Sequence, residues 1–294
     1  MIDKITEIAL KSLLYEVAAT PKPGLVDRHS NGAHTDMDFF TFMDSSVSLR
    51  TYFEEIKHAI INIYGSTSET RCDAEVVFKT IKPLGIDAEK KMLSCTKGVN
   101  THKGAIYALG LLVASATELE LSHGIQNVCG NERISYITER ASQYVLPHMD
   151  IEFSSGENYR NYGVDQFKKY GLLGARGEAA SGFFHARVVG LKALENAISS
   201  GLSQNDAMVQ SLLSIISSLE DSNVIGRRDR TILAISQVKA AYILELGGMH
   251  TKAGVDELNT YCQWCIAENI SHGGSADLLV VTLFLYFIKQ EGKD

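Results

Sequence analysis

The sequence is poor in proline, in cysteine and in clustered positive charge, and each shortage excludes a class of protein. The 294 residues include four prolines, which all lie at apparent helix boundaries. The five cysteines are an odd and sparse set, which argues against a disulfide framework. No run of Lys and Arg suggests a nucleic-acid groove, so we expect no DNA or RNA partner.

Long apolar runs and a targeting signal are also missing. The strongest apolar run, residues 278–288, is too short to span a bilayer and predicts a buried core helix. The first seven residues carry acidic side chains and do not form a signal peptide. We therefore expect a cytoplasmic protein with no membrane partner.

Common signatures of nucleotide and metal sites do not occur either. The patterns GxxxxGKS/T, GxGxxG and HExxH are absent, so nucleotide chemistry would need a helical scaffold with its own arrangement. The single Cys-x-x-Cys pair, Cys262 and Cys265, lacks the second pair that would make a zinc site plausible. We interpret it as two thiols on adjacent turns of a partly buried helix.

What is present is a globular composition with helical periodicity. Hydrophobic residues make up 45% and charged residues 21%, as in ordinary soluble proteins. Apolar residues recur at spacings of three and four, as at Ile5, Ile8 and Leu13, and no segment shows sustained strand-like alternation. We predict an all-α fold, a single multi-helix globular catalytic domain over residues 1–294, with about ten to twelve helices and no significant sheet.

Turn and cap residues set the expected helix boundaries. Pro21 and Pro23 should stop the first helix, and Ser203 and Ser275 should begin two later ones as N-caps. The predicted helices cover residues 3–19, 37–64, 72–82, 87–96, 103–121, 132–146, 159–170, 178–200, 204–219, 229–247, 251–269 and 275–290.

Polar clusters that mix glycine with charged residues lie near the expected helix ends. The net charge is −7, so an anionic ligand would need local cations and a metal to offset the protein's own field. Helix N-terminal amides, Lys or Arg, and carboxylates that carry a divalent metal are the groups that hold a polyphosphate. The clusters cover residues 21–38, 97–104, 173–182, 220–229 and 271–277.

Each cluster has an ordinary structural alternative. The first, second and fifth suit surface loops or capped helices, the third suits tight helix packing with an incidental ion pair, and the fourth suits an interhelical turn. Two histidines, His34 and His102, stand out because each lies in a charged cluster.

In this order and spacing, the clusters resemble the triphosphoribosyl-dephospho-coenzyme A synthase family. That family makes the prosthetic-group precursor of citrate lyase, and close relatives do the same for malonate decarboxylase. The resemblance spans nearly the whole chain. It rests on Glu16-Val17-Ala18-Ala19-Thr20-Pro21-Lys22-Pro23-Gly24-Leu25-Val26-Asp27, Thr101-His102-Lys103-Gly104, Gly174-Ala175-Arg176-Gly177-Glu178 and Gly273-Gly274-Ser275-Ala276-Asp277.

The resemblance implies a transferase that joins the triphosphoribosyl group of ATP to the 2′-hydroxyl of 3′-dephospho-CoA and releases adenine. Carboxylates would stabilise the oxocarbenium character at the ribose, and one would act as general base. We hypothesise catalytic roles for Asp27, Glu178 and Asp221. We expect Mg²⁺ to be held by Asp38, Asp221 and Asp277. Substrate and phosphate binding is assigned to Lys22, Arg28, Thr101, His102, Lys103, Arg176, Asn223, Arg227 and Ser275.

The chain departs from the family pattern in the fourth cluster and at two further positions. Asp221-Ser222-Asn223 replaces Asp-Thr-Asn and keeps the hydroxyl, whereas Arg227-Arg228-Asp229 replaces Arg-Gly-Gly. The second change leaves open which arginine meets substrate. Phe184 and His272 stand where proline is common, and neither change removes a chemical group that the reaction needs.

Two other functions stay open. An all-α, Mg²⁺-dependent hydrolase of nucleotides or ADP-ribose would use acidic clusters equally well, but it would not need dephospho-CoA. A non-catalytic helical binding module would scatter the charged clusters over its surface. For the synthase, a homodimer is possible, and the product would pass to an acyl-carrier-protein holo-synthase.

Overall fold

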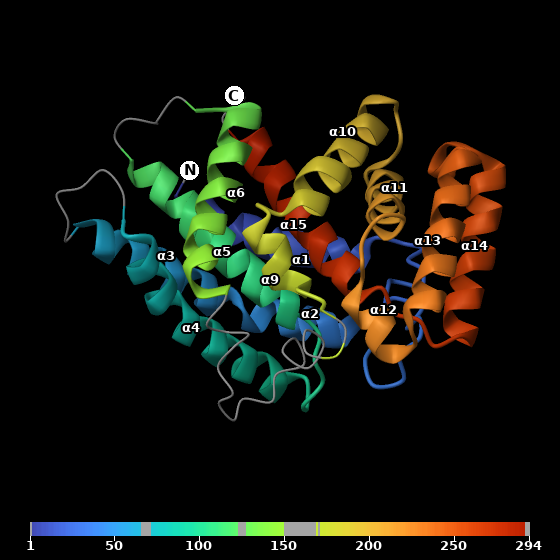
Figure 1. Cartoon of the computed structure of the whole chain (residues 1–294), viewed down its shortest axis with the longest axis horizontal. Helices are drawn as coiled ribbons and strands as arrows, with labels where there is room; N and C mark the ends of the chain where they lie inside the picture. The colour runs from blue at the N-terminus through green and yellow to red at the C-terminus, as the bar shows by residue number, and fades with distance from the viewer. Residues whose placement is uncertain (1, 66–71, 123–127, 150–168, 170, 292–294) are drawn as a thin grey trace. The chain divides into compact units, whose positions relative to one another are not determined.

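The computed structural model describes residues 2–65, 72–122, 128–149, 169 and 171–291. These residues form α-helices with short 3₁₀ and π turns, and no β-strand occurs among them. The predicted all-α class is therefore confirmed (Figure 1). The predicted helix over 159–170 lies outside the described residues, apart from Lys169.

The chain divides into two compact units, each built from separated stretches of sequence. The first unit comprises Met1–Ser12, Asp44–Phe183 and Phe284–Asp294, and the second comprises Leu13–Met43 and Phe184–Leu283. Three helices contain residues of both units: α1 (Lys4–Ala18), α2 (Phe39–Ser48) and α15 (Gly273–Gln290). The single catalytic domain over residues 1–294 stays a prediction.

Helix α5 (Lys103–Leu121) is the central helix of the first unit. It is buried along almost its whole length, because small and apolar residues occupy every face. It packs against α3 (Arg50–Gly65), α4 (Ala74–Cys95), α6 (Gly130–Val145) and the short α9 (Gly174–Ala180). In the described part of the chain it is the one helix long and apolar enough to cross a membrane, but 78% of that window is buried inside the protein.

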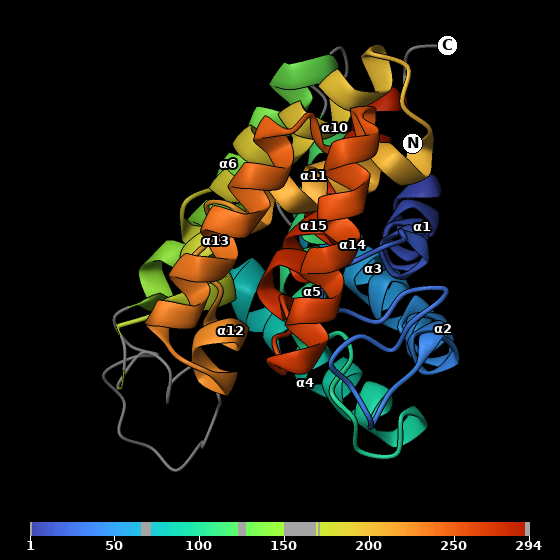
Figure 2. The same ribbon diagram turned by 90° about the vertical axis from the view of Figure 1, so that its right-hand side faces the viewer.

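The second unit is a set of paired helices. Helix α11 (Gln204–Ile216) packs against α10 (Leu191–Ser199) and α13 (Arg230–Glu245), and α13 packs against α14 (Lys252–Ala267). Figure 2 shows α13 and α14 side by side. The short helix α12 (Ser222–Arg227) joins α11 to α13 and occupies the fourth polar cluster.

Proline and cap signals had mixed success. The first helix ends at Ala18, before Pro21, and Ser203 caps α11 by accepting a hydrogen bond from the amide of Asp206 at 3.1 Å. Pro83, in contrast, lies inside α4, so the two helices predicted over 72–82 and 87–96 are one. Pro83 is exposed, and the buried face of α4 continues across it from Ile81 to Ala88. Packing of that face outweighs the one hydrogen bond that proline removes.

Two long predicted helices are interrupted. The helix predicted over 37–64 is broken at Leu49, between α2 and α3. The helix predicted over 178–200 ends at Ala180, and the next residues turn sharply, since Gly182 and Phe183 have φ values of +68° and +56°. A π-helical turn, His185–Gly190, then leads into α10. Apolar periodicity continued across both breaks and concealed them.

Candidate active site

The loop after α1, residues 20–34, contains most of the first polar cluster and is shaped by glycine. Gly24 has a φ of +68°, and a Cβ atom there would lie 2.0 Å from the carbonyl oxygen of Ile270. Only glycine allows both the backbone conformation and this close approach. The loop is thereby held against the segment that precedes α15.

Asp27 organises this loop from inside. Its carboxylate is buried and accepts hydrogen bonds from the amides of Lys22 at 3.0 Å, His29 at 2.8 Å and Ser30 at 2.9 Å. Oδ1 takes two of these bonds and Oδ2 takes one. Because a carboxylate offers about four acceptor positions, Oδ2 retains one for a further donor.

Lys22 is buried and paired rather than free. Its ammonium donates to the carboxylate of Glu16 at 2.5 Å and to the backbone oxygen of Glu16 at 2.9 Å. The two side chains are 2% and 3% exposed, so this is a buried ion pair. Burial raises the pKa of Glu16, and the charge of Lys22 offsets part of that rise.

Arg28 is also held within the second unit. Its guanidinium donates to the side-chain oxygen of Asn205 at 2.9 Å and to the hydroxyl of Thr20 at 3.3 Å. Asn205 in turn accepts from the amide of Thr20 and donates to its carbonyl. Arg28 and Asn205 therefore clamp the start of the loop.

Asp221 holds the N-termini of two helices together. It caps α12 by accepting from the amide of Asn223 at 2.9 Å. Its carboxylate also accepts from the amides of Gly274 at 3.2 Å and Ser275 at 2.8 Å, at the start of α15. The hydroxyl of Ser275 adds a fourth bond at 2.9 Å, so the acceptor positions of this buried carboxylate are filled.

This arrangement corrects the predicted cap of the last helix. Helix α15 begins at Gly273, so Ser275 lies in its first turn and is not the N-cap. The first amides of α15, those of Gly274 and Ser275, donate to Asp221, which is 54 residues from Ser275 in sequence. Asn223 packs on Gly273, where a Cβ atom would lie 3.0 Å from the Asn223 amide nitrogen. Asp277 is half-buried in the same first turn.

Arg227 contacts the loop, and its role in substrate binding stays a prediction. It donates to the carbonyl of Ala33 at 3.4 Å and to the side chain of Asn269 at 3.3 Å, and it lies 3.3 Å from Nδ1 of His34. Burial and the nearby Arg227 charge lower the pKa of His34. Nε2 of His34 pairs with the hydroxyl of Ser271 at 2.9 Å.

The unusual Arg228-Asp229 pair has local structural roles. Arg228 forms an ion pair with Glu268 at 2.7 Å. Asp229 is the N-cap of α13 and accepts from the amide of Ile232 at 2.8 Å. The departure from the family pattern therefore adds a helix cap and a surface ion pair beside Arg227.

His272 joins the loop to α13 and α14. Its Nδ1 lies 3.0 Å from the carbonyl oxygen of Pro23, and its Nε2 lies 2.7 Å from the Ser236 hydroxyl and 3.1 Å from the Tyr261 hydroxyl. A carbonyl can only accept, so Nδ1 carries the proton and Nε2 accepts. Burial lowers the pKa of His272 and favours this neutral form.

An open pocket of about 670 Å³ lies between the loop and α14. The loop side includes Lys22, Asp27 and Ser30, and the α14 side includes Asn259 and Gln263. Two of the predicted site residues, Lys22 and Asp27, thus border the same cavity. Asp221, Asn223 and Ser275 meet at the starts of α12 and α15, and Arg227 contacts the end of the loop.

The predicted magnesium ligands form no preassembled cation site. In the described part of the chain, no group of three or more His, Cys, Asp or Glu side chains is placed to hold a metal. Asp38 is exposed and caps α2 locally, since its Oδ1 accepts from the amide and hydroxyl of Thr41. Those hydrogen bonds lower the pKa of Asp38, and Asp221 is committed to four donors. Mg²⁺ binding by Asp38, Asp221 and Asp277 stays a prediction.

The other predicted residues belong to the first unit. Thr101 and His102 both contact the Ser45 hydroxyl, at 2.7 Å each. Lys103 forms an ion pair with Glu89. Arg176 and Glu178 lie in α9, where the Arg176 guanidinium lies 5.9 Å from the centroid of the Tyr107 ring.

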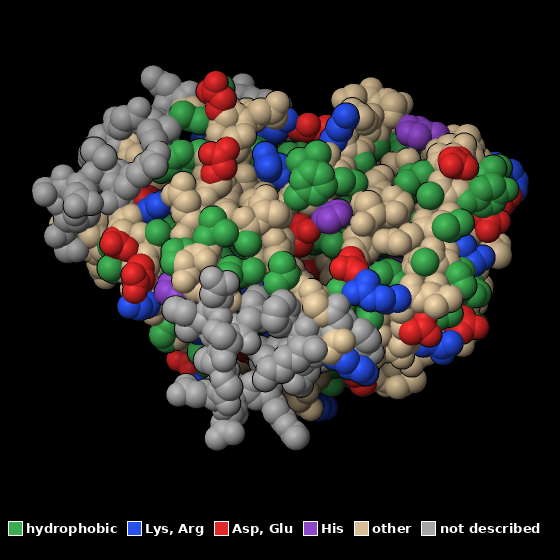
Figure 3. Space-filling view, in the orientation of Figure 1, with side chains coloured by type: hydrophobic (Ala, Val, Ile, Leu, Met, Phe, Trp, Pro, Cys, Tyr) green, Lys and Arg blue, Asp and Glu red, His purple; other side chains and the backbone are tan. Residues whose placement is uncertain are grey.

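Positive and negative side chains are mixed on the face drawn in Figure 3. Among the coloured residues on the face drawn in Figure 3, Lys and Arg side chains lie beside Asp and Glu side chains. That mixture differs from the clustered basic surface of nucleic-acid-binding domains.

Known proteins match this chain along almost its full length. The profile of the family ATP:dephospho-CoA triphosphoribosyl transferase matches residues 2–294. The chain belongs to this family. A 2-(5″-triphosphoribosyl)-3′-dephosphocoenzyme-A synthase of Escherichia fergusonii is 35% identical over 98% of this chain and 92% of its own length.

Two further known proteins are similar to this chain. Protein CitXG of Leuconostoc mesenteroides subsp. cremoris is 37% identical over 96% of this chain, and the chain spans 58% of the length of that relative. The crystal structure of a proposed triphosphoribosyl-dephospho-CoA synthase from Archaeoglobus fulgidus aligns with a TM-score of 0.52. It covers 84% of this chain and 99% of the other at 16% identity, which supports the shared fold alone.

In this triphosphoribosyl transferase family member, sequence reasoning missed Glu16 as a site residue. The signal was present, because Glu16 continues the spacing of Ile5, Ala9 and Ser12 on the buried stripe of α1. An acidic residue on an apolar stripe predicts a buried partner of opposite charge. Lys22, six residues later, is that partner.

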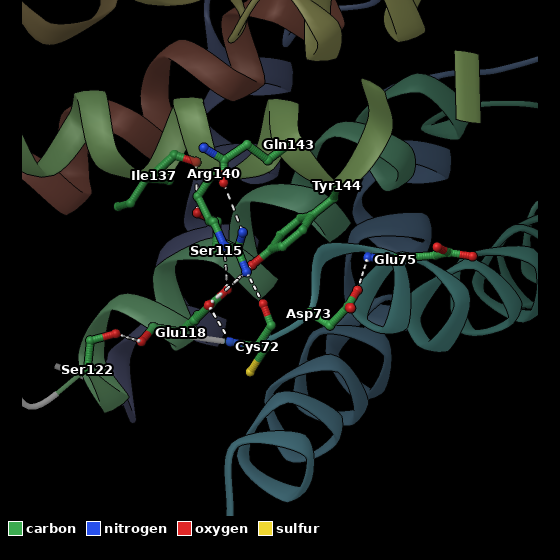
Figure 4. Close-up of polar contacts among 10 residues, drawn as sticks. All are labelled: Cys72, Asp73, Glu75, Ser115, Glu118, Ser122, Ile137, Arg140, Gln143 and Tyr144. Carbon is green, nitrogen blue, oxygen red and sulfur yellow. Dashed lines mark hydrogen bonds and ion pairs between the residues drawn. The ribbon is translucent and has the colours of Figure 1, made fainter. Parts of the chain in front are cut away.

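A second buried charge cluster, in the first unit, was also missed (Figure 4). Glu118 is fully buried and accepts from Arg140 at 2.8 and 2.9 Å, from the Tyr144 hydroxyl at 2.5 Å and from the amide of Cys72 at 2.9 Å. Arg140 also donates to the carbonyl of Cys72. The cluster joins α5, α6 and the segment before α4.

Proposed function

We propose that this protein transfers the triphosphoribosyl group of ATP to the 2′-hydroxyl of 3′-dephospho-CoA and releases adenine. The observation that carries the proposal is the family match over residues 2–294. The synthase of Escherichia fergusonii, whose name states the product of this reaction, adds support over 98% of the chain. Nothing in the comparisons favours the hydrolase alternative.

In the proposed reaction, the bond between the ATP ribose and adenine breaks, and a bond from the ribose carbon to the acceptor 2′-oxygen forms. Adenine leaves with the bonding electron pair, and the hydroxyl loses its proton. A carboxylate is needed near the developing positive charge and as general base. Of the three carboxylates predicted for catalysis, Asp27 borders the pocket and retains an acceptor position. Glu178 in α9 stays a candidate.

Asp221 suits a positioning role better than a chemical one. Its four accepted hydrogen bonds join α12 to the start of α15, and a proton or a metal would have to displace one of these donors. We propose that Asp221 holds Asn223, Ser275 and the amides of α15 in a fixed arrangement. Substrate contacts would then come from the residues that Asp221 positions.

Magnesium is proposed to arrive as part of the MgATP substrate. Mg²⁺ on a nucleotide keeps several waters and needs only one or two protein carboxylates, which fits a described chain without a preassembled cation cluster. The metal would neutralise the triphosphate, which does not react. A cytoplasmic location, a homodimer and delivery of the product to an acyl-carrier-protein holo-synthase complete the proposal.

The decisive experiment incubates the protein with MgATP and 3′-dephospho-CoA and measures free adenine together with the mass of the CoA product. We expect adenine and product in equal amounts, and no adenine when dephospho-CoA is omitted. Adenine or ribose phosphates formed without acceptor would indicate hydrolysis instead. Formation of ADP or pyrophosphate would refute triphosphoribosyl transfer.

The carboxylate assignment is tested with Asp27→Asn in the same assay. We expect adenine release to fall by about 10²-fold or more, the usual scale for losing a general base. The matched control is Asp44→Asn, because Asp44 is an exposed acid on α2. An active Asp27→Asn protein would remove Asp27 from the chemistry and leave Glu178 as the candidate.

A further inference from the structure

The pocket between the loop and α14 has a polar wall and an apolar strip. Asn259, Gln263 and Ile266 lie at spacings of four and three on α14, and all three are exposed and line the pocket. Pro21 and the hydroxyl-bearing Ser30 line the opposite side. A ligand here would meet amide groups alternating with apolar surface.

The charge of the pocket disfavours a phosphate ligand. Lys22 is the sole Lys or Arg among the lining residues, all of which lie in the described part of the chain. Its ammonium is neutralised by the buried Glu16 carboxylate at 2.5 Å. Asp27 adds a carboxylate to the same wall. A polyphosphate needs several charge-assisted donors, and these walls do not supply them.

The lining also disfavours a nucleobase. Adenine rings bind best between flat apolar or aromatic surfaces, and no Phe, Tyr or Trp is among the described residues that line the pocket. Asn and Gln side chains each donate and accept hydrogen bonds, which suits a chain of amide groups. The volume of about 670 Å³ lies within the usual range for small-molecule sites.

We infer that this pocket binds the pantetheine arm of dephospho-CoA. The inference rests on the proposed function, which makes dephospho-CoA a substrate. The arm is uncharged and elongated, and it carries two amides and a dimethyl group, so its polar and apolar parts match Asn259 and Gln263 beside Ile266. ATP has no corresponding group. The pocket therefore distinguishes acceptor from donor.

Cys262 lies in the same wall and offers the arm a protonated thiol. Burial and the nearby Asp27 carboxylate raise the pKa of Cys262 to about 12. A thiol that stays protonated is a poor nucleophile. Cys262 therefore adds a weakly polar surface to the wall and no thiolate.

The test compares dephospho-CoA with ADP, which has the same adenosine diphosphate part and lacks the arm. Binding of each is measured by titration calorimetry for the full-length wild type and for the double variant Asn259→Ala/Gln263→Ala, without ATP. We expect dephospho-CoA to bind the wild type more tightly than ADP. The double variant should weaken dephospho-CoA binding by about 10-fold, as expected for two lost hydrogen bonds, and should leave ADP binding unchanged.

Control variants and other outcomes decide the inference. Asn196→Ala removes an exposed amide on α10, outside the pocket, and should change neither affinity. Ile266→Ser replaces an apolar side chain of the strip by a small polar one. It should weaken the binding of dephospho-CoA and leave the binding of ADP unchanged. The inference would be overturned if the double variant weakened the binding of both ligands equally or weakened neither. It would also be overturned if the wild type bound dephospho-CoA and ADP with equal affinity. Selective weakening in a protein that releases no adenine would retain the arm site and reject the proposed reaction.

Discussion

The two units each bury a carboxylate against a cation, but they use the pair differently. Glu118 in the first unit accepts four hydrogen bonds from Arg140, Tyr144 and Cys72. Glu16 in the second unit accepts its side-chain hydrogen bond from Lys22, its one such partner among the described residues. The Glu118 cluster joins helices, whereas the Glu16 pair borders a pocket through Lys22.

The difference teaches which pair is structural and which can change state. A guanidinium keeps its charge and binds a carboxylate through a planar fork, whereas an ammonium is a point charge that can lose its proton when buried. In the first unit, burial would lower the pKa of Arg140, but the hydrogen bonds and charge of Glu118 raise it overall. Glu118 also raises the pKa of Tyr144, after the larger effect of burial.

The largest expected effect comes from breaking the saturated pair. Glu118→Gln leaves the Arg140 guanidinium buried without a counter-charge, so the free energy of unfolding should fall by about 3–5 kcal/mol. Glu16→Gln should cost less, because the Lys22 ammonium keeps its hydrogen bond to the backbone oxygen of residue 16. Urea unfolding followed by circular dichroism measures both. Glu139→Gln, at an exposed position beside Arg140, should change stability by less than about 0.5 kcal/mol.

This comparison is contradicted if Glu118→Gln and Glu16→Gln lower the free energy of unfolding by the same amount. An equal loss in Glu16→Gln would mean that the backbone hydrogen bond of Lys22 does not compensate for the lost carboxylate, and that the second pair is as rigid as the first. A Glu118→Gln variant of wild-type stability would show that Arg140 finds another acceptor.

The next largest loss of stability is expected for Asp221, which caps two helices, compared with Asp73, which caps one. Asp221 accepts four hydrogen bonds at the starts of α12 and α15, whereas Asp73 accepts two at the start of α4. Asp221→Ala should therefore lower the free energy of unfolding by about 2–3 kcal/mol, and Asp73→Ala by about 1 kcal/mol. Thermal and urea unfolding of the two variants should rank them in this order. Similar losses would contradict the double cap.

The smallest effect is a pH dependence at His272. Burial lowers its pKa in the folded protein, and Asp221 and the Pro23 carbonyl offset part of that change. The unfolded chain regains a pKa of about 6.5 and binds the proton first, so stability is full above that pH and falls as the pH drops toward the folded pKa. The size of the loss is set by how far the folded pKa of His272 lies below the unfolded one.

His272→Gln should flatten this slope. Urea unfolding at several pH values between about 5 and 7 measures the slope for the wild type, for His272→Gln and for His58→Gln, in which an exposed histidine is removed. The His58 variant should retain the wild-type slope. A His272→Gln protein with the wild-type slope would place the titrating group elsewhere.

Periodicity predicted the helical class and most helix positions, but it could not locate breaks inside apolar stripes. Leu49 ends α2 without any proline or glycine to mark it. Pro83 gave the opposite error, a predicted break where the helix continues. An exposed proline interrupts the sequence pattern more than it interrupts the helix. Both outcomes depend on tertiary packing, which a local pattern does not contain.

The candidate site was predictable by residue and less so by role. Lys22, Asp27 and Asp221 were predicted as site residues, which stays a prediction, and the structure shows all three buried. Their partners could not be read from spacing, since Asp221 meets Ser275 across 54 positions. Lys22 was expected to face a phosphate and instead faces Glu16. Long-range pairing decides whether a charge is available to a ligand.

The interleaved composition of the two units has a consequence for biosynthesis. The first unit lacks Phe284–Asp294 until the last residues emerge from the ribosome, and the second lacks α14 and most of α15 until shortly before. At about 5–20 residues per second, the 100 residues from 184 to 283 take about 5–20 s to add. Throughout that time, the apolar α5 lacks the final helix segment of its own unit. The first unit therefore cannot complete its fold until the segment that begins at Phe284 has left the ribosome.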